Sequence, residues 1–284
     1  MIRLTSKQDS SVNFVLPSES GMFESRFVDR PNSGHSIIYL SSMSGCARAC
    51  RMCHLTATQQ VRAVPATMED YLEQARPVVA HLKSLGESES KPLIHYNFMA
   101  RGEALDNPIL QGSAQVLFEK LAGLVAPTPS KFLISSIFPK TAPLELARFK
   151  GAHLPTFYYS LYSVGHDRAK WIPQGRAPRE VLRALTEWQQ STGAEVKVHF
   201  AFIKGFNDSP ESVAAITSAV KESGLLARFN IVRYNPPDHT SEEPEEAKIA
   251  SLVDLLREDF DVKVVPRVGF DVQASCGMFV GALE

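Results

Sequence analysis

The stretch Ser44-Gly-Cys-Ala-Arg-Ala-Cys-Arg-Met-Cys-His54 contains three of the four cysteines of this chain, Cys46, Cys50 and Cys53. This C-x3-C-x2-C loop directly follows an apolar, strand-like segment, Ile37–Ser41, so that three thiolates lie within reach of one metal centre. Thiolates favour zinc or iron–sulfur clusters. Zinc usually needs a fourth ligand and paired C-x2-C knuckles, and the sequence has no second knuckle. We therefore predict a 4Fe–4S cluster held by three cysteines, with one iron open to a small molecule; the alternative is three unrelated buried cysteines.

The composition indicates the size of the domain and the cellular compartment, but it says little about the binding partner. With 284 residues, of which 44% are hydrophobic, the chain fits one large domain or one domain with a small appendage. No run of about eighteen apolar residues occurs, the N-terminus lacks the apolar core of a signal peptide, and the cysteines are sparse and clustered. These features predict a cytoplasmic protein without a membrane span. The formal net charge of −1 neither requires nor excludes a nucleic-acid partner.

Two parts are expected along the chain. Residues 1–35 form a short N-terminal extension, in which Val12–Leu16 and Phe23–Phe27 alternate in hydrophobicity and predict a β-hairpin. Residues 36–284 form the main domain, where short apolar runs alternate with amphipathic stretches. Strands are predicted at Ile37–Leu40, Leu93–Met99, Phe132–Ser135, Phe157–Leu161, Val196–Ile203, Phe229–Val232 and Val262–Val265. Helices are predicted at Met68–Leu85, Ile109–Leu124, Leu144–Phe149, Arg179–Ser191, Pro210–Ser223 and Glu245–Asp259.

This alternation of strands and helices predicts right-handed βαβ units around a parallel sheet. About six such units in the main domain are too few for a closed eight-stranded barrel. The predicted fold class is therefore α/β, a partial, open (β/α)6 barrel with a short N-terminal hairpin extension.

Polar residues follow several predicted strands, at the edge where such barrels carry their sites. Asn97–Leu105 follows the second strand and contains Gly102 and Glu103. The glycine allows the backbone to approach a ligand, and the carboxylate can accept a hydrogen bond from an amino group. Other short polar groups at strand ends are Ser135 and Ser136, Ser160–Ser163 and Tyr234–Pro237. Each of these is equally consistent with ordinary turn and cap chemistry.

The fourth cysteine, Cys276, lies eight residues from the C-terminus in Asp271-Val-Gln-Ala-Ser-Cys-Gly-Met-Phe279. A lone cysteine is usually a small buried hydrophobe. Next to a glycine in a mobile C-terminal loop, it is alternatively a reactive thiol that swings over the mouth of the barrel.

The cysteine spacing resembles the signature of radical S-adenosylmethionine (SAM) enzymes, whose open iron chelates the amino and carboxylate groups of SAM. More specifically, the chain resembles the RlmN/Cfr family of radical SAM methyl synthases from about Val12 to Phe279. The matching segments are Ser41–Cys53, Thr56–Gln60, Met99–Leu105, Ser160–Tyr162, Asn207-Asp208, Tyr234–Pro236 and Asp271–Gly277.

The resemblance implies a mechanism and a set of site residues. Members of the family methylate adenosine in RNA at ring carbon 2 or carbon 8. The cysteine matching Cys276 receives a methyl group from one SAM, and a radical derived from a second SAM abstracts hydrogen from that methyl before it adds to the base. The residues that match the family's SAM contacts are Gly102, Glu103, Ser135, Ser160, Tyr162 and Asn235.

Three departures from the family pattern affect these expectations. The family has a second catalytic cysteine, which helps to deprotonate the adduct and then frees the product, and Tyr39 stands at that position here. We name Tyr39 as a candidate catalytic residue, although an ordinary phenol pKa near 10 makes it a poor base at neutral pH. The N-terminal accessory domain of the RNA-binding members is expected to be missing. Arg101 introduces a charge beside the site, to pair with a phosphate or with Glu103, or to lie exposed at the surface.

The sequence thus favours a cytoplasmic, monomeric radical SAM methyltransferase that binds a 4Fe–4S cluster and SAM. Its expected partners are RNA (tRNA or rRNA) or another adenine-containing substrate, and an electron donor such as flavodoxin or ferredoxin. The first alternative is a radical SAM enzyme that abstracts hydrogen from a nucleotide or nucleic-acid base without methyl transfer. The second is a non-catalytic metal protein that binds RNA.

Overall fold

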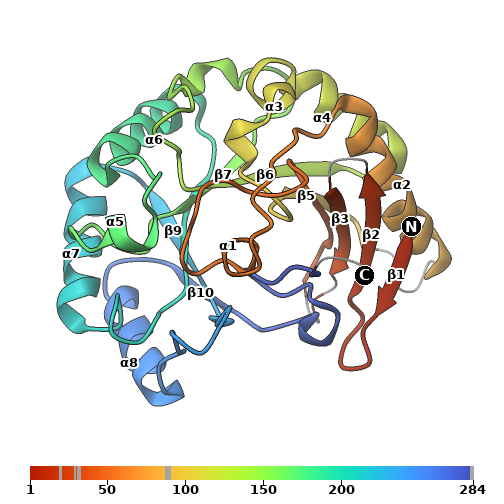
Figure 1. Ribbon diagram of the computed structural model, residues 1–284. Helices are drawn as coiled ribbons and strands as arrows, with labels where there is room; N and C mark the ends of the chain where they lie inside the picture. Colours follow the sequence, from red (N-terminus) through yellow and green to blue (C-terminus); the bar gives the residue numbers. More distant parts are fainter. Residues whose placement is uncertain (19–20, 29, 31–32, 87–90, 282–284) are drawn as a thin grey trace.

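The computed structural model describes residues 1–18, 21–28, 30, 33–86 and 91–281 of the chain. Its centre is a ten-stranded sheet whose spatial order follows the sequence from β1 to β10 (Figure 1). The strands are β1 (Ile2–Thr5), β2 (Val12–Ser18), β3 (Gly21–Val28), β4 (Ser36–Leu40), β5 (Ile94–Phe98), β6 (Ser130–Ser136), β7 (Thr156–Ser160), β8 (Val196–Phe200), β9 (Ala227–Val232) and β10 (Val262–Val265).

The sheet changes character at β4. Strands β4 to β10 are parallel, whereas β1, β2 and β3 run antiparallel and β3 pairs with β4. Within the described residues β10 pairs only with β9, so the parallel part curves without closing. The predicted α/β fold with an open, partial barrel is confirmed. The segment before residue 36 joins the same sheet through β3, and a division into two parts at residue 35 stays a prediction.

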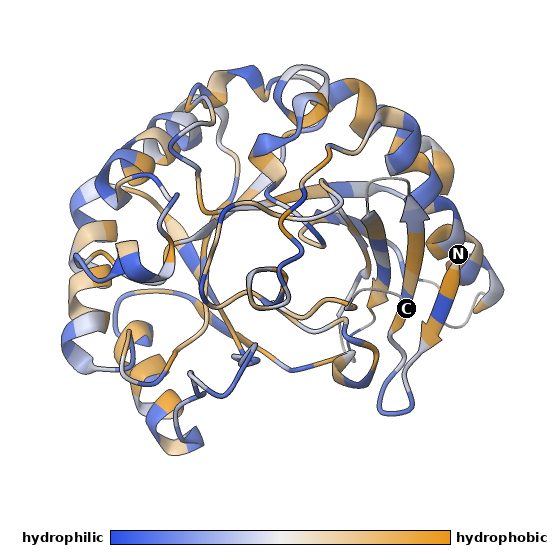
Figure 2. Ribbon diagram, in the orientation of Figure 1, coloured by the Kyte–Doolittle hydropathy of each residue, from blue (hydrophilic) through white to orange (hydrophobic). Residues whose placement is uncertain are grey.

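Helices surround the parallel strands as an outer ring (Figure 1). The α-helices are α1 (His54–Ala57), α2 (Met68–Ser84), α3 (Pro108–Gly112), α4 (Ala114–Val125), α5 (Arg168–Trp171), α6 (Pro178–Thr192), α7 (Pro210–Ser223) and α8 (Glu246–Arg257). Short 3-10 turns cover Ala104–Asp106, Leu146–Arg148 and Phe270–Val272. Hydrophobic and hydrophilic segments alternate along the ring helices, as amphipathic packing on a sheet requires (Figure 2). No helix of the described residues is long and apolar enough to cross a membrane.

Local signals determine where the long helices begin and end. The Thr67 side chain accepts a hydrogen bond from the Asp70 backbone, and the Asp70 carboxylate accepts one from the Thr67 backbone, which caps α2. The Ser209 side chain caps α7, and Gly224 ends it in the left-handed conformation.

Two helix predictions differ from the structure. The helix expected at Ile109–Leu124 is divided at Ser113 into α3 and α4. The helix expected at Leu144–Phe149 is only the 3-10 turn Leu146–Arg148, in which the N–H groups of Arg148 and Phe149 donate to carbonyl groups three residues earlier.

Strand alternation places polar side chains inside the barrel. In β8, Val196, Val198 and Phe200 are fully buried on one face. His199 and Lys197, on the other face, line internal cavities. The C-terminal ends of the parallel strands share one edge, and α1 lies over this edge in the centre of Figure 1.

Candidate active site

A cavity of about 250 Å³ opens among the loops at the C-terminal ends of the parallel strands. Every residue predicted for the site lines it, and the structure therefore brings together groups from five strands or the loops after them and from the C-terminal segment. These residues are Tyr39, Cys46, Cys50, Cys53, Gly102, Glu103, Ser135, Ser160, Tyr162, Asn235 and Cys276.

The cysteine loop is held at both ends. At Gly45 a Cβ atom would lie 2.5 Å from the carbonyl oxygens of Gln60 and Arg62, so only glycine fits this close backbone approach. The Arg48 guanidinium forms two hydrogen bonds of 2.5 Å with the Asp106 carboxylate, which attaches the loop to the segment after β5. The loop that carries the three thiols is therefore preorganised by the protein.

The three thiols face one cavity without surrounding a single ion. Burial raises the pKa of Cys46 to about 12, and the pKa values of Cys50 and Cys53 also rise. In the described part of the chain, no three His, Cys, Asp or Glu side chains are placed to hold one metal ion. One zinc ion draws its sulfurs in to about 2.3 Å from the metal, whereas a four-iron cube spreads its cysteines around a larger body. The donor set therefore fits the cube better than zinc.

Gly102 and Glu103 form the wall after β5. Gly102 has a φ of +89°, and a Cβ there would lie 2.4 Å from the Met43 side chain, so this position requires glycine. The Glu103 carboxylate accepts hydrogen bonds from the backbone N–H groups of Leu105 (3.1 Å) and Ile137 (3.2 Å). Burial nevertheless raises the pKa of Glu103 to about 7. A hydrogen-bond donor arriving in the cavity would stabilise its ionised form.

The loops after β6 and β7 supply further polar groups. The hydroxyl oxygens of Ser135 and Ser160 lie 3.3 Å apart. Tyr162 adopts a left-handed φ of +56°, and the Asn207 side chain donates a 3.0 Å hydrogen bond to its carbonyl oxygen. The Oδ1 atom of Asn97, on a side chain that lines the cavity, is buried without a hydrogen-bond partner. An unsatisfied acceptor of this kind fits a ligand that carries N–H or O–H groups.

Cys276 is fixed beside the cluster loop. The Asn235 side chain donates to the Cys276 carbonyl (2.8 Å) and to the Ser275 hydroxyl (3.0 Å), and the His54 backbone donates to the Gly277 carbonyl (3.1 Å). Cys276 is exposed to solvent as a residue, and the protein atoms packed around its thiol raise the pKa of that thiol to about 11. The loop predicted to swing over the barrel would have to break these contacts in order to move.

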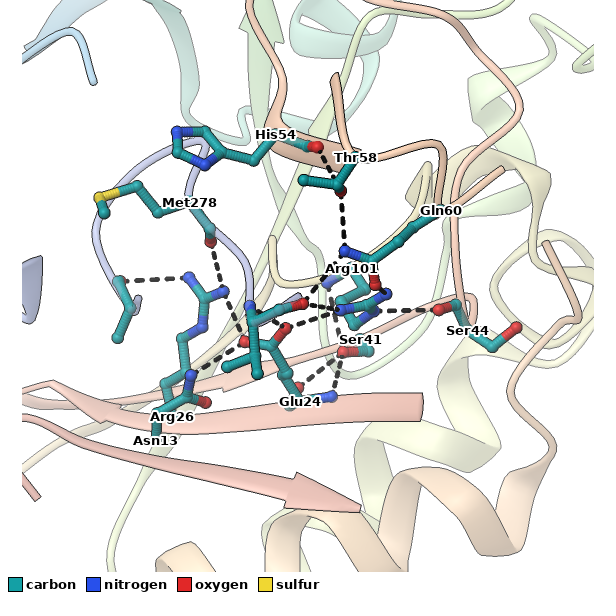
Figure 3. A network of polar contacts seen from close by, with 12 residues as sticks. Asn13, Glu24, Arg26, Ser41, Ser44, His54, Thr58, Gln60, Arg101 and Met278 are labelled. Atoms are coloured by element: carbon teal, nitrogen blue, oxygen red, sulfur yellow. Dashed lines mark hydrogen bonds and ion pairs between the residues drawn. The ribbon is translucent and has the colours of Figure 1, made fainter. Parts of the chain in front are cut away.

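A buried ion network connects β3, the loop after β5 and the C-terminal segment (Figure 3). Glu24 is fully buried, and its carboxylate accepts from Arg26 (2.9 Å), Arg101 (2.8 Å) and the Val280 backbone (3.0 Å). Arg26 also donates hydrogen bonds to the carbonyl oxygens of Ala274 (3.1 Å) and Met278 (2.7 Å), which lie on either side of Cys276. The network therefore positions the Cys276 loop.

The position of Arg101 corrects the sequence-based expectation. Arg101 is 2% exposed and bonds with Glu24, the Ser44 carbonyl and the Gln60 side chain. It neither lies at the surface nor pairs with Glu103. The sequence could not show this, because Glu24 precedes Arg101 by 77 residues and meets it only when β3 pairs with β4.

Arg101→Met is expected to lower the free energy of unfolding by about 3–5 kcal/mol, because it leaves part of a buried carboxylate without a charged partner. Arg76→Met is the matched control: Arg76 and Glu69 form an exposed ion pair, whose loss should cost less than about 1 kcal/mol. Chemical denaturation measures both values. Equal losses in the two variants would show that the buried network contributes no special stability.

Tyr39 projects from β4 into the cavity, and the Arg30 guanidinium donates a 3.3 Å hydrogen bond to its hydroxyl. Sequence reasoning missed Arg30, Tyr158 and His199, which also line the cavity. His199 alternates with apolar residues in β8, but that pattern does not show which face of the sheet the cavity occupies. Arg30 lies beyond the end of β3, and Tyr158 lies within a strand of aromatic residues, so neither gave such a signal.

Curated proteins similar to this chain are RNA methyltransferases. A probable RNA methyltransferase of Rhodopirellula baltica is 27% identical over 98% of this chain and 72% of its own length. The probable dual-specificity RNA methyltransferase RlmN of Parabacteroides distasonis is 25% identical over 95% of this chain and 75% of its own length. The ribosomal RNA large subunit methyltransferase Cfr of Staphylococcus aureus is 26% identical over 88% of this chain and 70% of its own length. The chain is therefore similar, over most of its length, to RNA methyltransferases that include RlmN and Cfr.

A solved structure shares the fold of this chain. A radical SAM methyltransferase from Sphaerobacter thermophilus matches it with a TM-score of 0.81 at 17% identity, over 98% of this chain and 80% of that one. No family model matches the chain. Since the structural match extends over nearly the whole chain, it includes the antiparallel strands β1–β3 as well as the open barrel.

Proposed function

We propose that this protein is a radical SAM methyltransferase that methylates carbon 2 or carbon 8 of an adenine base in RNA. The observation that carries the proposal is that Cys276 lines the same cavity as Cys46, Cys50 and Cys53. A thiol in that place can take up a methyl group and present it to a base in the same space. The RNA methyltransferases to which the chain is similar support RNA as the substrate.

The protein contributes binding and positioning to this chemistry. When bound, the cluster and SAM would supply a methyl group and a 5′-deoxyadenosyl radical. Cys46, Cys50 and Cys53 would hold the cluster, and Glu103 would accept from the amino group of SAM. Further contacts to SAM would come from Gly102, Ser135, Ser160, Tyr162 and Asn235. Reduction of the cluster requires an external electron donor of the flavodoxin or ferredoxin kind.

The methyl acceptor is the Cys276 thiolate, since the thiolate is the nucleophile. A pKa of about 11 leaves this thiol mostly protonated at neutral pH, so methyl uptake requires a proton acceptor or a favourable approach of the methyl donor. The ring carbon of adenine is electron-poor and not a nucleophile, which is why radical addition from a protein-bound carbon suits it.

The decisive experiment incubates the anaerobic, reduced protein with methyl-labelled SAM and total RNA, followed by digestion to nucleosides. Labelled 2-methyladenosine or 8-methyladenosine is the expected product, together with S-adenosylhomocysteine and 5′-deoxyadenosine. Formation of 5′-deoxyadenosine alone would favour the alternative of hydrogen abstraction without methyl transfer. The replacement of a catalytic thiol by Tyr39 is the feature of the chain that keeps this alternative open.

The affinity for SAM is expected to depend on the ionisation of Glu103. Its pKa near 7 is raised from the ordinary value, so the carboxylate that binds an amino group forms as the pH rises through about 7. The ratio of SAM affinities between wild type and Glu103→Gln should therefore grow between about pH 6 and pH 8. Equilibrium binding measurements at several pH values test this, and a constant ratio would argue against contact between Glu103 and SAM.

Tyr39→Cys is expected to accelerate product release. If chemistry reaches an adduct between Cys276 and adenine, the wild type has no second cavity thiol to resolve it, and a covalent protein–RNA species should accumulate. Added glutathione or dithiothreitol should help wild type more than Tyr39→Cys. Denaturing gels with labelled RNA follow the adduct, with Tyr39→Phe as the control for loss of the hydroxyl alone. Multiple turnovers without any trapped adduct or thiol dependence would contradict this route.

A further inference from the structure

The inner face of the barrel is rich in positive charge below the active-site cavity. Strand register aligns Tyr158, Lys197 and Arg228 across β7, β8 and β9. The neighbouring inward row is formed by Ser160, His199, Asn230 and Lys263. Because Ser160 belongs to the predicted SAM site, the row that carries Lys263 begins at that site.

Two cavities meet along these rows. The active-site cavity reaches from the cysteine loop to Tyr158, His199 and Asn230. A second cavity of about 130 Å³ shares Asn230 with it and is lined by Lys197, Arg228, Asp261 and Lys263, among others. Val265, which lines the first cavity, and Lys263, which lines the second, are two residues apart on β10, or roughly 7 Å. We call this second region the barrel floor.

Positive charge exceeds negative charge at the barrel floor. The Glu195 carboxylate forms ion pairs with Lys131 (2.8 Å), Lys197 (3.6 Å) and Arg228 (3.4 Å). Arg228 also forms an ion pair with Asp261 (3.0 Å). Three cations thus share one glutamate. Among the described residues no carboxylate forms an ion pair with Lys263.

Arg30 adds a further cation from the far side of the open seam. Its guanidinium donates to the Tyr39 hydroxyl, and its Nε atom is buried without a hydrogen-bond partner. The imidazole rings of His35 and His95 stack nearby, with their centroids 3.7 Å apart. Burial, together with the nearby charges of Lys263 and Arg30, lowers the pKa of His35 to about 4. Arg30 lines the active-site cavity together with Val265, which is two residues from Lys263 on β10, so the two cations lie near the same part of the barrel interior.

We propose that the barrel floor binds a phosphate group of the substrate nucleotide, with Lys263 and Lys197 as its cationic partners. The inference rests on the proposed function, since it places the base near Cys276 and the phosphate at the opposite end of the barrel interior, where Arg228 and Asp261 are exposed to solvent. A phosphate group would balance the excess positive charge of the barrel floor. It would also supply several acceptor oxygens for the lysine and guanidinium donors. Asn230 lines both cavities, so a base in the first and a phosphate in the second would be neighbours.

The test compares ligands that differ only in phosphate. The anaerobically reconstituted protein is titrated with adenosine, adenosine 5′-monophosphate and inorganic phosphate. The monophosphate is expected to bind about tenfold or more tightly than adenosine, as one or two charge-assisted contacts would give. Lys263→Met and Lys197→Met should each reduce this advantage severalfold and leave adenosine binding unchanged. Lys120→Met, at an exposed position on α4, is the matched control and should change neither affinity.

A second experiment distinguishes a phosphate within the RNA strand from a terminal 5′-phosphate. Short adenine-containing oligoribonucleotides with and without a 5′-phosphate are bound to the same variants over a range of salt concentrations. If the floor binds a phosphate within the strand, Lys263→Met should reduce the slope of log affinity against log salt concentration by about one. If it binds a terminal 5′-phosphate, the same substitution should weaken the binding of the phosphorylated oligonucleotide only. Equal affinities for adenosine and its monophosphate, together with RNA binding unaffected in both lysine variants, would overturn the inference.

Failure of this inference and failure of the proposed function give different results. Labelled methyladenosine without any phosphate preference means that only the barrel-floor assignment is wrong. A phosphate preference that Lys263→Met removes, in a protein that methylates no adenine, leaves the binding site standing and removes the methylation proposal.

Discussion

Replacement of Cys46, Cys50 or Cys53 by alanine is expected to abolish the iron content of the protein completely. The wild type, purified without oxygen, should be brown, with about four irons per chain and a broad absorbance near about 400 nm. A cube bound by only two protein thiolates would be open to solvent and thiols, so each single substitution should remove it. Iron and sulfide analysis together with the absorption spectrum measure the effect.

Cys276→Ala is the matched control for the cluster variants. Its thiol lines the same cavity and is the fourth cysteine of the chain, but it lies outside the C-x3-C-x2-C loop. Its replacement should leave iron, sulfide and colour unchanged. A colourless wild-type protein with stoichiometric zinc would contradict the cluster, as would loss of iron in Cys276→Ala.

The second large effect concerns Cys276 as methyl carrier. Protein expressed with an intact cluster loop should carry one additional methyl group on the peptide that contains Cys276, and Cys276→Ala should lose all RNA methylation. The physical reason is the placement of this thiol beside the cluster loop, where Asn235 and Arg26 hold the backbone on either side of it. Peptide mass spectrometry detects the modification directly.

Two controls separate a specific role from general damage. Cys46→Ala should lack the methyl mark on Cys276, because the methyl group is installed by chemistry that needs the intact site. Cys276→Ser should retain the cluster and SAM binding while it loses methylation, since the hydroxyl is a far weaker nucleophile than a thiolate. Active enzyme with only unmodified Cys276 would remove this residue from the mechanism.

Much of the fold follows from local pattern. The helix predicted at Pro210–Ser223 coincides with α7, because a serine cap precedes it and a glycine in the left-handed conformation ends it. The parallel strands were recognised from apolar runs separated by amphipathic segments, which are short-range features. β1, at Ile2–Thr5, was not predicted, since its exposed side chains give no burial signal and its partner β2 determines it.

Some residues of the candidate site were likewise predictable from the sequence, and others were not. Residues on loops that directly follow strands, such as Glu103 and Ser160, were predictable because parallel strands bring their C-terminal ends to one edge. The ion network of Glu24, Arg26 and Arg101 was not, because charged residues within an apolar strand do not reveal their partners in advance. Arg101 illustrates this: its neighbours in sequence suggested Glu103, and its neighbour in space is Glu24.

The sequence by itself determined the thiol loop, the order of strands and helices, and the likeness to RlmN and Cfr, since each depends on spacing within a short segment. Only the tertiary structure decided what surrounds Cys276 and what lies at the barrel floor. Arg30, which follows β3, and Val265, which is two residues from Lys263 on β10, line one cavity because the sheet curves around it. Curvature of that kind arises from the twist and packing of all the strands together, and no local pattern contains it.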